Sequence, residues 1–130
     1  MDRMKIVIID DNEKFSAVLH FLFSMQNNCE VIALLTHEDA PKNKVLQEAS
    51  LAIVAVKSTD LKTLETIRFI KETYSLKILA LPLHLRDALV KELKSMKVDG
   101  ILSKDSADPD HILEALNQIS KKDRYYHLNG

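Results

Sequence analysis

The sequence contains few of the residues that build disulfide scaffolds, metal clusters or glycine-rich ligand loops. Its 130 residues include one cysteine, no tryptophan and only two glycines. One cysteine forms neither an intramolecular disulfide nor a cysteine metal cluster, so we expect Cys29 to be a buried thiol. No apolar run approaches the roughly 18 residues of a membrane span, and the N-terminus lacks the features of a signal peptide. These absences favour a cytoplasmic protein that does not enter a membrane.

What is present is ordinary for one globular domain. Hydrophobic residues make up 46% of the chain and charged residues 28%, and the net charge is −1 at pH 7. A chain of this length buries one core but not two. Its near-neutral charge argues against direct nucleic-acid binding by this domain. We expect a single domain over residues 4–122, with 123–130 as a tail or the start of a linker.

Short apolar runs alternate with segments of helical spacing along the chain. Several runs show no polar alternation, which is typical of strands covered on both faces of a parallel sheet. The segments between them place apolar residues three and four apart, as on one face of a helix. This order predicts a doubly wound α/β sheet of five parallel strands with helices on both faces. The expected strands are residues 4–9, 30–35, 51–56, 77–81 and 100–102, and the expected helices lie around 15–23, 41–49, 61–70, 85–96 and 112–119.

Polar residues that can carry chemistry come directly after these strands, where a doubly wound sheet places its ligand crevice. Asp10 and Asp11 follow the first strand. Two adjacent carboxylates can bind Mg²⁺ through oxygen, or they can cap the following helix, where negative charge meets the helix dipole. The pair alone favours neither role. The other strand-end residues are Lys57, Ser58 and Thr59 after the third strand, Pro82 and His84 after the fourth, and Lys104 after the fifth.

Two stretches resemble the receiver domains of two-component response regulators. The opening MKIVIIDDNEKF carries the acidic pair, and the stretch ILALPLHLRDALVKELKSMKVDGILSKD carries a turn at residues 98–100 and a lysine, Lys104, at the family's spacing. The final KKDRYY is similar to the branch whose receivers precede a LuxR-type DNA-binding domain. The resemblance implies a flavodoxin-like sheet with strand order 2-1-3-4-5. It also implies that the chain is the N-terminal part of a transcription regulator.

The resemblance fails at the residues that would carry phosphorylation. The family's acceptor aspartate falls on Val56 or Lys57, and neither has a carboxylate. Pro82 stands at the switch Ser/Thr position without a hydroxyl or an N–H, and Ile101 stands at the aromatic switch position. Phosphoryl transfer needs an oxygen nucleophile held in line beside Mg²⁺. The pattern therefore implies an atypical receiver that is not an enzyme, has no required cofactor and binds Mg²⁺ weakly at the acidic pair.

Two interpretations of the third strand's end stay open. If Lys57 takes the acceptor position, we hypothesise that it pairs with Asp10 or Asp11 and occupies the place of the metal, next to Lys104. If Val56 takes that position, Lys57 points into solvent.

Three functions follow from these residues. The first is a phosphorylation-independent module that acts through a protein partner or as a homodimer. The resemblance implies that it binds through the helix near 85–96, the fifth strand and the last helix, or through the first and last helices. The second is a working phosphoacceptor that uses Asp60 with Mg²⁺. The third is a small-molecule-binding domain of the flavodoxin type, against which the scarcity of glycine counts, since only Ser58 and Thr59 can hold a phosphate there.

The remaining candidates are expected to be structural. The five histidines lack the spacing of zinc ligands. Tyr125 and Tyr126 are expected to pack on the last helix or to begin a linker, with a dimer contact as the alternative.

Overall fold

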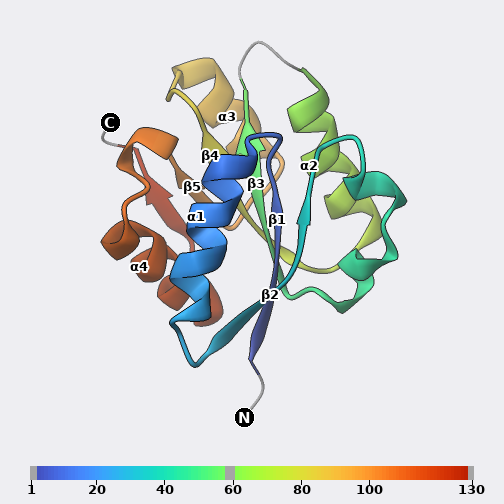
Figure 1. The fold of residues 1–130 in the computed structure, drawn as a ribbon. Helices are drawn as coiled ribbons and strands as arrows, with labels where there is room; N and C mark the ends of the chain where they lie inside the picture. The colour runs from blue at the N-terminus through green and yellow to red at the C-terminus, as the bar shows by residue number, and fades with distance from the viewer. Residues whose placement is uncertain (1–2, 58–60, 129–130) are drawn as a thin grey trace.

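The computed structural model describes residues 3–57 and 61–128, which form a six-stranded parallel sheet with helices on both faces (Figure 1). The strand order is β2-β1-β3-β4-β5-β6. The strands are β1 (Met4–Ile9), β2 (Cys29–Leu35), β3 (Leu51–Val56), β4 (Lys77–Pro82), β5 (Gly100–Leu102) and β6 (Tyr125–His127). The α-helices are α1 (Glu13–Ser24), α2 (Leu61–Thr73), α3 (Asp87–Ser95) and α4 (Pro109–Ser120). The described residues also contain three short 3₁₀ turns: η1 (Ala40–Lys42), η2 (Lys44–Glu48) and η3 (Lys104–Ser106).

The central strands are buried on both sides, which accounts for their continuous apolar sequences. Every residue of β3 is buried. Because successive side chains of a strand point to opposite faces, the sheet supports two separate cores. One core joins the sheet to α1 and α4, for example through Phe23 and Ile112. The other joins it to α2 and α3, for example through Ile67 and Leu93. This arrangement confirms the five expected strands, their order, and four of the five expected helices.

The helix expected around 41–49 is wrong. The chain there forms η1 and η2, separated by Asn43 in an extended conformation. The Asn43 side chain accepts a hydrogen bond from the Val45 N–H at 2.9 Å, so it begins a new turn and interrupts the previous one. Each turn buries one apolar side chain, Ala40 and Leu46 respectively. A full helical stripe is absent from the sequence, and two short turns suffice to cover this part of the sheet.

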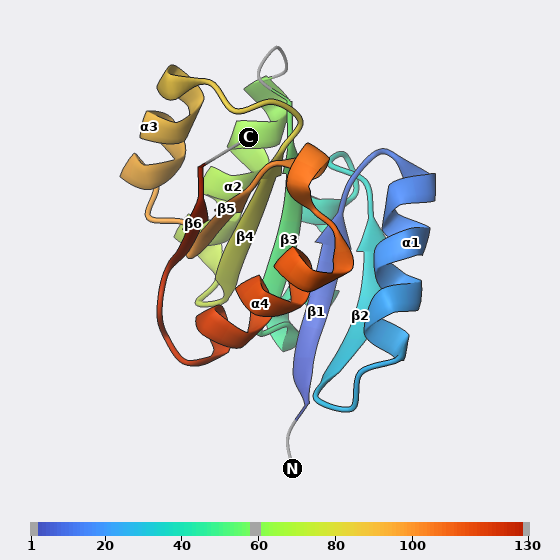
Figure 2. The same ribbon diagram turned by 90° about the vertical axis from the view of Figure 1, so that its left-hand side faces the viewer.

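The expected count of five strands is also wrong, because the chain adds β6 beyond β5 (Figure 2). After α4 the backbone turns at Lys122, whose φ is 67°, and residues Tyr125–His127 pair in parallel with β5. Gly100 lets the strands approach, because a Cβ there would lie 3.2 Å from the Tyr125 carbonyl oxygen and 2.7 Å from Leu79. Tyr125 is buried in the core that contains α4, as expected. It lies in a strand, however, and not in a linker.

Within the described residues, no helix has the length and apolar character needed to cross a membrane.

Candidate functional site

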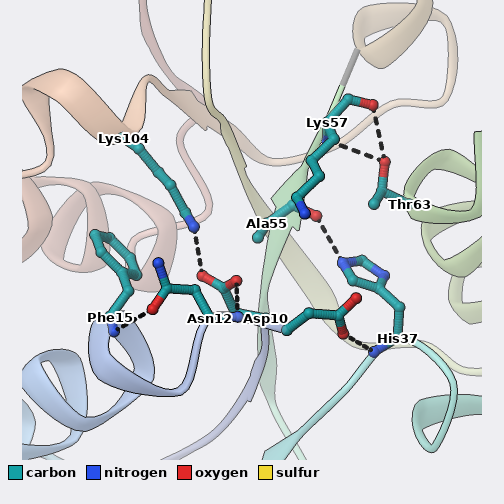
Figure 3. Close-up of polar contacts among 9 residues, drawn as sticks. Asp10, Asn12, Phe15, His37, Ala55, Lys57, Thr63 and Lys104 are labelled. Carbon is teal, nitrogen blue, oxygen red and sulfur yellow. Dashed lines mark hydrogen bonds and ion pairs between the residues drawn. The ribbon is translucent and has the colours of Figure 1, made fainter. Parts of the chain in front are cut away.

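The carboxyl ends of the strands meet at one edge of the sheet, and a buried ion pair lies there. Asp10 directly follows β1, and its backbone N–H donates to the Leu35 carbonyl at 2.9 Å. The carboxylate oxygen Oδ1 accepts a hydrogen bond from the Asn12 N–H at 2.9 Å. The other oxygen, Oδ2, lies 2.7 Å from Nζ of Lys104, which begins η3 after β5 (Figure 3). The sequence-predicted residues Asp10 and Lys104 are therefore in direct contact.

The Asp10–Lys104 contact is well shielded from water. The Asp10 side chain is 4% exposed and the Lys104 side chain 13%. Oδ2 accepts no hydrogen bond of good geometry, so its interaction with the Lys104 ammonium is mainly an attraction between charges. The Lys104 ammonium also lies 4.5 Å from the ring centroid of Phe15 on α1, within the range of a cation–π interaction. The lysine thus ties the segment after β5 to both β1 and α1.

Asp11 turns away from this pair and joins a second network. Its Oδ1 accepts a hydrogen bond from the backbone N–H of His37 at 2.9 Å. The buried His37 ring reaches the Ala55 carbonyl with Nε2 at 2.8 Å and the Thr66 hydroxyl with Nδ1 at 2.8 Å. Because a carbonyl only accepts, Nε2 carries the proton. Figure 3 shows this ring linking the segment after β2 to the end of β3.

His37 was not singled out by the sequence analysis as a site residue. Its position two residues after an apolar strand is the only sequence signal that marks it. It connects the loops after β1 and β2 to β3 and α2, so it fixes the shape of this edge.

The two candidates for the acceptor position lie in different environments. Val56 ends β3 and is 1% exposed in the core beneath α2 and α3. Lys57 follows it and is exposed; its backbone N–H donates to the Thr63 hydroxyl at 3.1 Å, and that hydroxyl lies 3.2 Å from the Lys57 carbonyl. The hypothesised ion pair of Lys57 with Asp10 or Asp11 is not formed in the described part of the chain. Among the described residues, Lys104 supplies the cation for Asp10.

The remaining predicted positions are apolar or lie outside the described residues. Pro82 ends β4, is buried and lies opposite Val56 in the strand register. Ile101 lies in β5 and is fully buried. Ser58, Thr59 and Asp60 lie outside the described residues.

The carboxylates at this edge do not fit a Mg²⁺ ion. Magnesium requires several oxygen ligands in octahedral geometry. Both oxygens of Asp10 are already engaged, one by a backbone N–H and the other by an ammonium group, while Asp11 is directed toward His37. Across residues 3–57 and 61–128, no three His, Cys, Asp or Glu side chains gather as a metal-binding group.

Comparison with known proteins identifies the fold. No protein-family model matches the sequence, and no curated protein matches it either. Solved structures do match. The isolated receiver domain of RcsB from Salmonella enterica serovar Typhimurium, in the presence of phosphomimetic BeF₃⁻, aligns with a TM-score of 0.83 at 19% identity, over 97% of this chain and 94% of that one.

Two further neighbours are named as response regulators. A LuxR-family two-component response regulator from Aurantimonas sp. SI85-9A1 aligns with a TM-score of 0.82 at 17% identity, over 95% of this chain and 89% of that one. The Thermotoga maritima response regulator DrrB, an OmpR/PhoB homologue, aligns with a TM-score of 0.78 at 21% identity, over 95% of this chain but only 55% of that one. The chain described here has the fold of response-regulator receiver domains.

Proposed function

We propose that this chain is a phosphorylation-independent, receiver-like signalling domain that acts by binding proteins. The observation that carries the proposal is the Asp10–Lys104 ion pair, at 2.7 Å, in a site whose acceptor positions hold Val56 and Lys57. The Lys104 ammonium already pairs with the negative charge of Asp10, which leaves less charge there to attract a divalent cation. No described residue at the end of β3 offers an oxygen nucleophile for phosphoryl transfer.

Strand geometry supports Lys57, rather than Val56, as the residue at the acceptor position. Val54 and Val56 point into the core beneath α2 and α3, whereas Ile53 points to the face of α1 and α4. Continued alternation directs Lys57 to that same face, where Lys104 contacts Phe15. The acceptor position then carries a cation in place of an anion, which disfavours both Mg²⁺ and a phosphoryl group.

The switch positions support the same proposal. Pro82 has neither a hydroxyl nor an N–H for a phosphoryl oxygen. Ile101 is fully buried and has no polar group to move between two environments. Partner binding is then the function left to the fold. In a longer protein it would regulate a separate output domain, as the match to a LuxR-family regulator suggests for transcription.

The competing function is a phosphoacceptor receiver that uses Asp60 with Mg²⁺. An amide-shift NMR titration with Mg²⁺, followed by beryllofluoride, separates the two. We expect no saturable shifts at Asp10, Asp11 and Lys104. Saturable shifts that spread from these residues into α3 would refute the proposal, and loss of those shifts in Asp60→Asn would identify the acceptor. A flavin or another bound chromophore in the purified protein would favour the small-molecule alternative.

The expected binding faces differ in how open they are. The edge of β5 is paired with β6, so a partner cannot reach it directly. The outer surface of α1 is open, and together with the C-cap residue Met25 it carries an apolar stripe of Val18, Phe21 and Met25, which are 65%, 70% and 63% exposed. This stripe favours the first and last helices for self-association. Size-exclusion chromatography with light scattering, on wild type and Phe21→Glu, tests whether a homodimer depends on it.

A further inference from the structure

A groove with a volume of about 600 Å³ lies between α3 and Leu128, the residue after β6. Figure 2 shows α3 and β6 on the same side of the molecule, beyond β5. Leu85 and Val90 form part of its lining and pack against the core beneath α2 and α3, so their positions are fixed. Leu128 lines the opposite side and is 39% exposed. The groove therefore has an apolar floor that is partly open to water.

The rim of this groove is positively charged. Arg86, Lys91 and Lys94 line it, against a single carboxylate, Asp87. Within residues 3–57 and 61–128, none of these three cations forms an ion pair. Lys94 lies over the ring of Tyr126 in β6, with Nζ 5.4 Å from the centroid. This local excess of positive charge stands out in a chain whose net charge is −1.

The groove exists because the chain departs from a five-stranded sheet. Arg124 and Tyr126 both contact the Val98 carbonyl, at 2.7 and 2.9 Å, and thereby hold the segment around β6 against the turn between α3 and β5. This anchorage sets Leu128 across from α3. One side of the groove is thus formed by Leu128, which lies after the last helix, and the other side by α3 and the residues just before it.

We infer that this groove binds an acidic segment of a protein partner that also carries apolar anchors. The inference rests on the proposed function, since it names the chemistry of the partner through which the domain would act. Carboxylates would pair with Arg86, Lys91 and Lys94, and one or two aliphatic side chains would cover Leu85, Val90 and Leu128. Opposite charges on the two surfaces favour encounter and fix orientation, and buried apolar anchors supply most of the affinity. A nucleic-acid phosphate chain would satisfy the cations but leave the apolar floor exposed.

The probe for this site is a short synthetic peptide rich in glutamate and leucine, followed by amide-shift NMR on the complete chain. We expect saturable shifts confined to α3, β6 and Leu128. A peptide with glutamine in place of glutamate, and one with alanine in place of leucine, should each bind more weakly. The double variant Lys91→Glu/Lys94→Glu should weaken binding of the glutamate–leucine peptide by about tenfold or more, because two attractive pairs become repulsive.

Matched variants control for the change in net charge and for folding. Lys14→Glu/Lys42→Glu makes the same charge change at exposed positions on α1 and η1 and should leave peptide binding unchanged. Since Lys94 contacts Tyr126, Lys91→Glu alone is measured as well; Lys91 is exposed and makes no such contact. A reduced affinity in this single variant supports the site even if the double variant perturbs β6.

Several results would overturn the inference. Equal binding of the glutamine peptide, unchanged affinity in Lys91→Glu, or shifts centred on α1 would each do so. Stronger shifts of the groove residues with phosphatidylserine vesicles would assign it to a lipid surface, and shifts that depend on protein concentration alone would assign it to a second copy. A response of Asp10 and Lys104 to beryllofluoride, together with peptide binding, would refute the proposed function and leave the groove intact. No response to beryllofluoride, together with no binding of the glutamate–leucine peptide, would refute the groove alone.

Discussion

Replacing Lys104 by methionine is the sharpest test of how the candidate site is held together. Methionine keeps much of the length of the side chain and its contact with Phe15, but it removes the positive charge from Oδ2 of Asp10. The carboxylate, 4% exposed, then stays buried beside a neutral group. A buried charge without a partner is strongly unfavourable, so we expect the folded state to lose stability at neutral pH.

The structure sets the size of this effect. At 2.7 Å the Coulomb attraction between two unit charges is about 6 kcal/mol for an effective dielectric constant of about 20. Much of that attraction offsets the cost of removing both charges from water, which amounts to several kcal/mol per ion. Breaking such a pair from one side typically costs about 3–5 kcal/mol, and we expect about 3 kcal/mol here because Lys104 retains 13% exposure.

Urea unfolding followed by far-UV circular dichroism measures the loss, and a double-mutant cycle assigns it. Asp10→Asn alone leaves a lysine that can bend toward water, so it should cost less than Lys104→Met. The double variant Asp10→Asn/Lys104→Met should recover a large part of the loss, with a coupling energy above about 1 kcal/mol.

A second ion pair provides the control. Lys71 and Asp99 lie 3.7 Å apart with side chains 29% and 18% exposed. This longer and more solvent-exposed pair should contribute less than about 1 kcal/mol to the free energy of unfolding, so Lys71→Met should lower stability only slightly. If Lys104→Met is equally mild, or if the coupling between Asp10 and Lys104 is near zero, the pair is screened by solvent and the reasoning is wrong.

Three further predictions concern other parts of the fold. Burial raises the pKa of the Cys29 thiol, against a smaller lowering effect of Arg3, so little thiolate forms at neutral pH; alkylation by iodoacetamide should be much slower in the folded than in the urea-unfolded protein, and equal rates would contradict this. Hydrogen bonds from His111, first from its backbone N–H, hold the pKa of Asp108 below its ordinary value of 3.8. The stability gained from this low pKa is present above pH 3.8 and is lost as the pH falls through the pKa of the folded state. Because Asp108→Asn keeps a capping oxygen but cannot be protonated in this range, it should flatten the decline of the thermal midpoint in acid. Gly100→Ala places a Cβ 2.7 Å from Leu79 and should cost about 1–3 kcal/mol while speeding amide exchange at Tyr125; an unchanged exchange rate there would show that β6 does not depend on this close approach.

The sequence predicts the sheet well because its central strands carry an unambiguous signal. Residues 51–56 are apolar without interruption, and all of them are buried in β3. The strand ends then place Asp10 and Lys104 at one edge, and their contact follows from opposite charge. The sheet topology brings these two residues to the same edge, although 94 positions separate them in the sequence.

The features that the sequence does not predict depend on tertiary contacts. β6 has only three residues, too few for a recognisable pattern. It forms because Gly100 allows a close approach of the backbone and because the Val98 carbonyl accepts a hydrogen bond from the Tyr126 hydroxyl. The turns η1 and η2 contain too few apolar residues to distinguish them from a helix. His37 is hidden for a different reason, since its role comes from Ala55 and Thr66 in other elements, which no spacing along the chain reveals.

Under the proposed function, the source of the cation at this edge decides how the domain can respond to a signal. A diffusible metal or a phosphoryl group can leave, so a site that depends on it has two states of charge. Lys104 is part of the chain, and with Phe15 and Asp10 it holds the loops after β1 and β5 in one arrangement. A signal that acted here would have to break a buried ion pair at a cost of several kcal/mol. A partner that binds elsewhere need only recognise the arrangement that already exists. For a domain with such a site, regulation is therefore expected to come through the supply of partner or through its affinity, and the groove beside α3 is the surface on which to measure it.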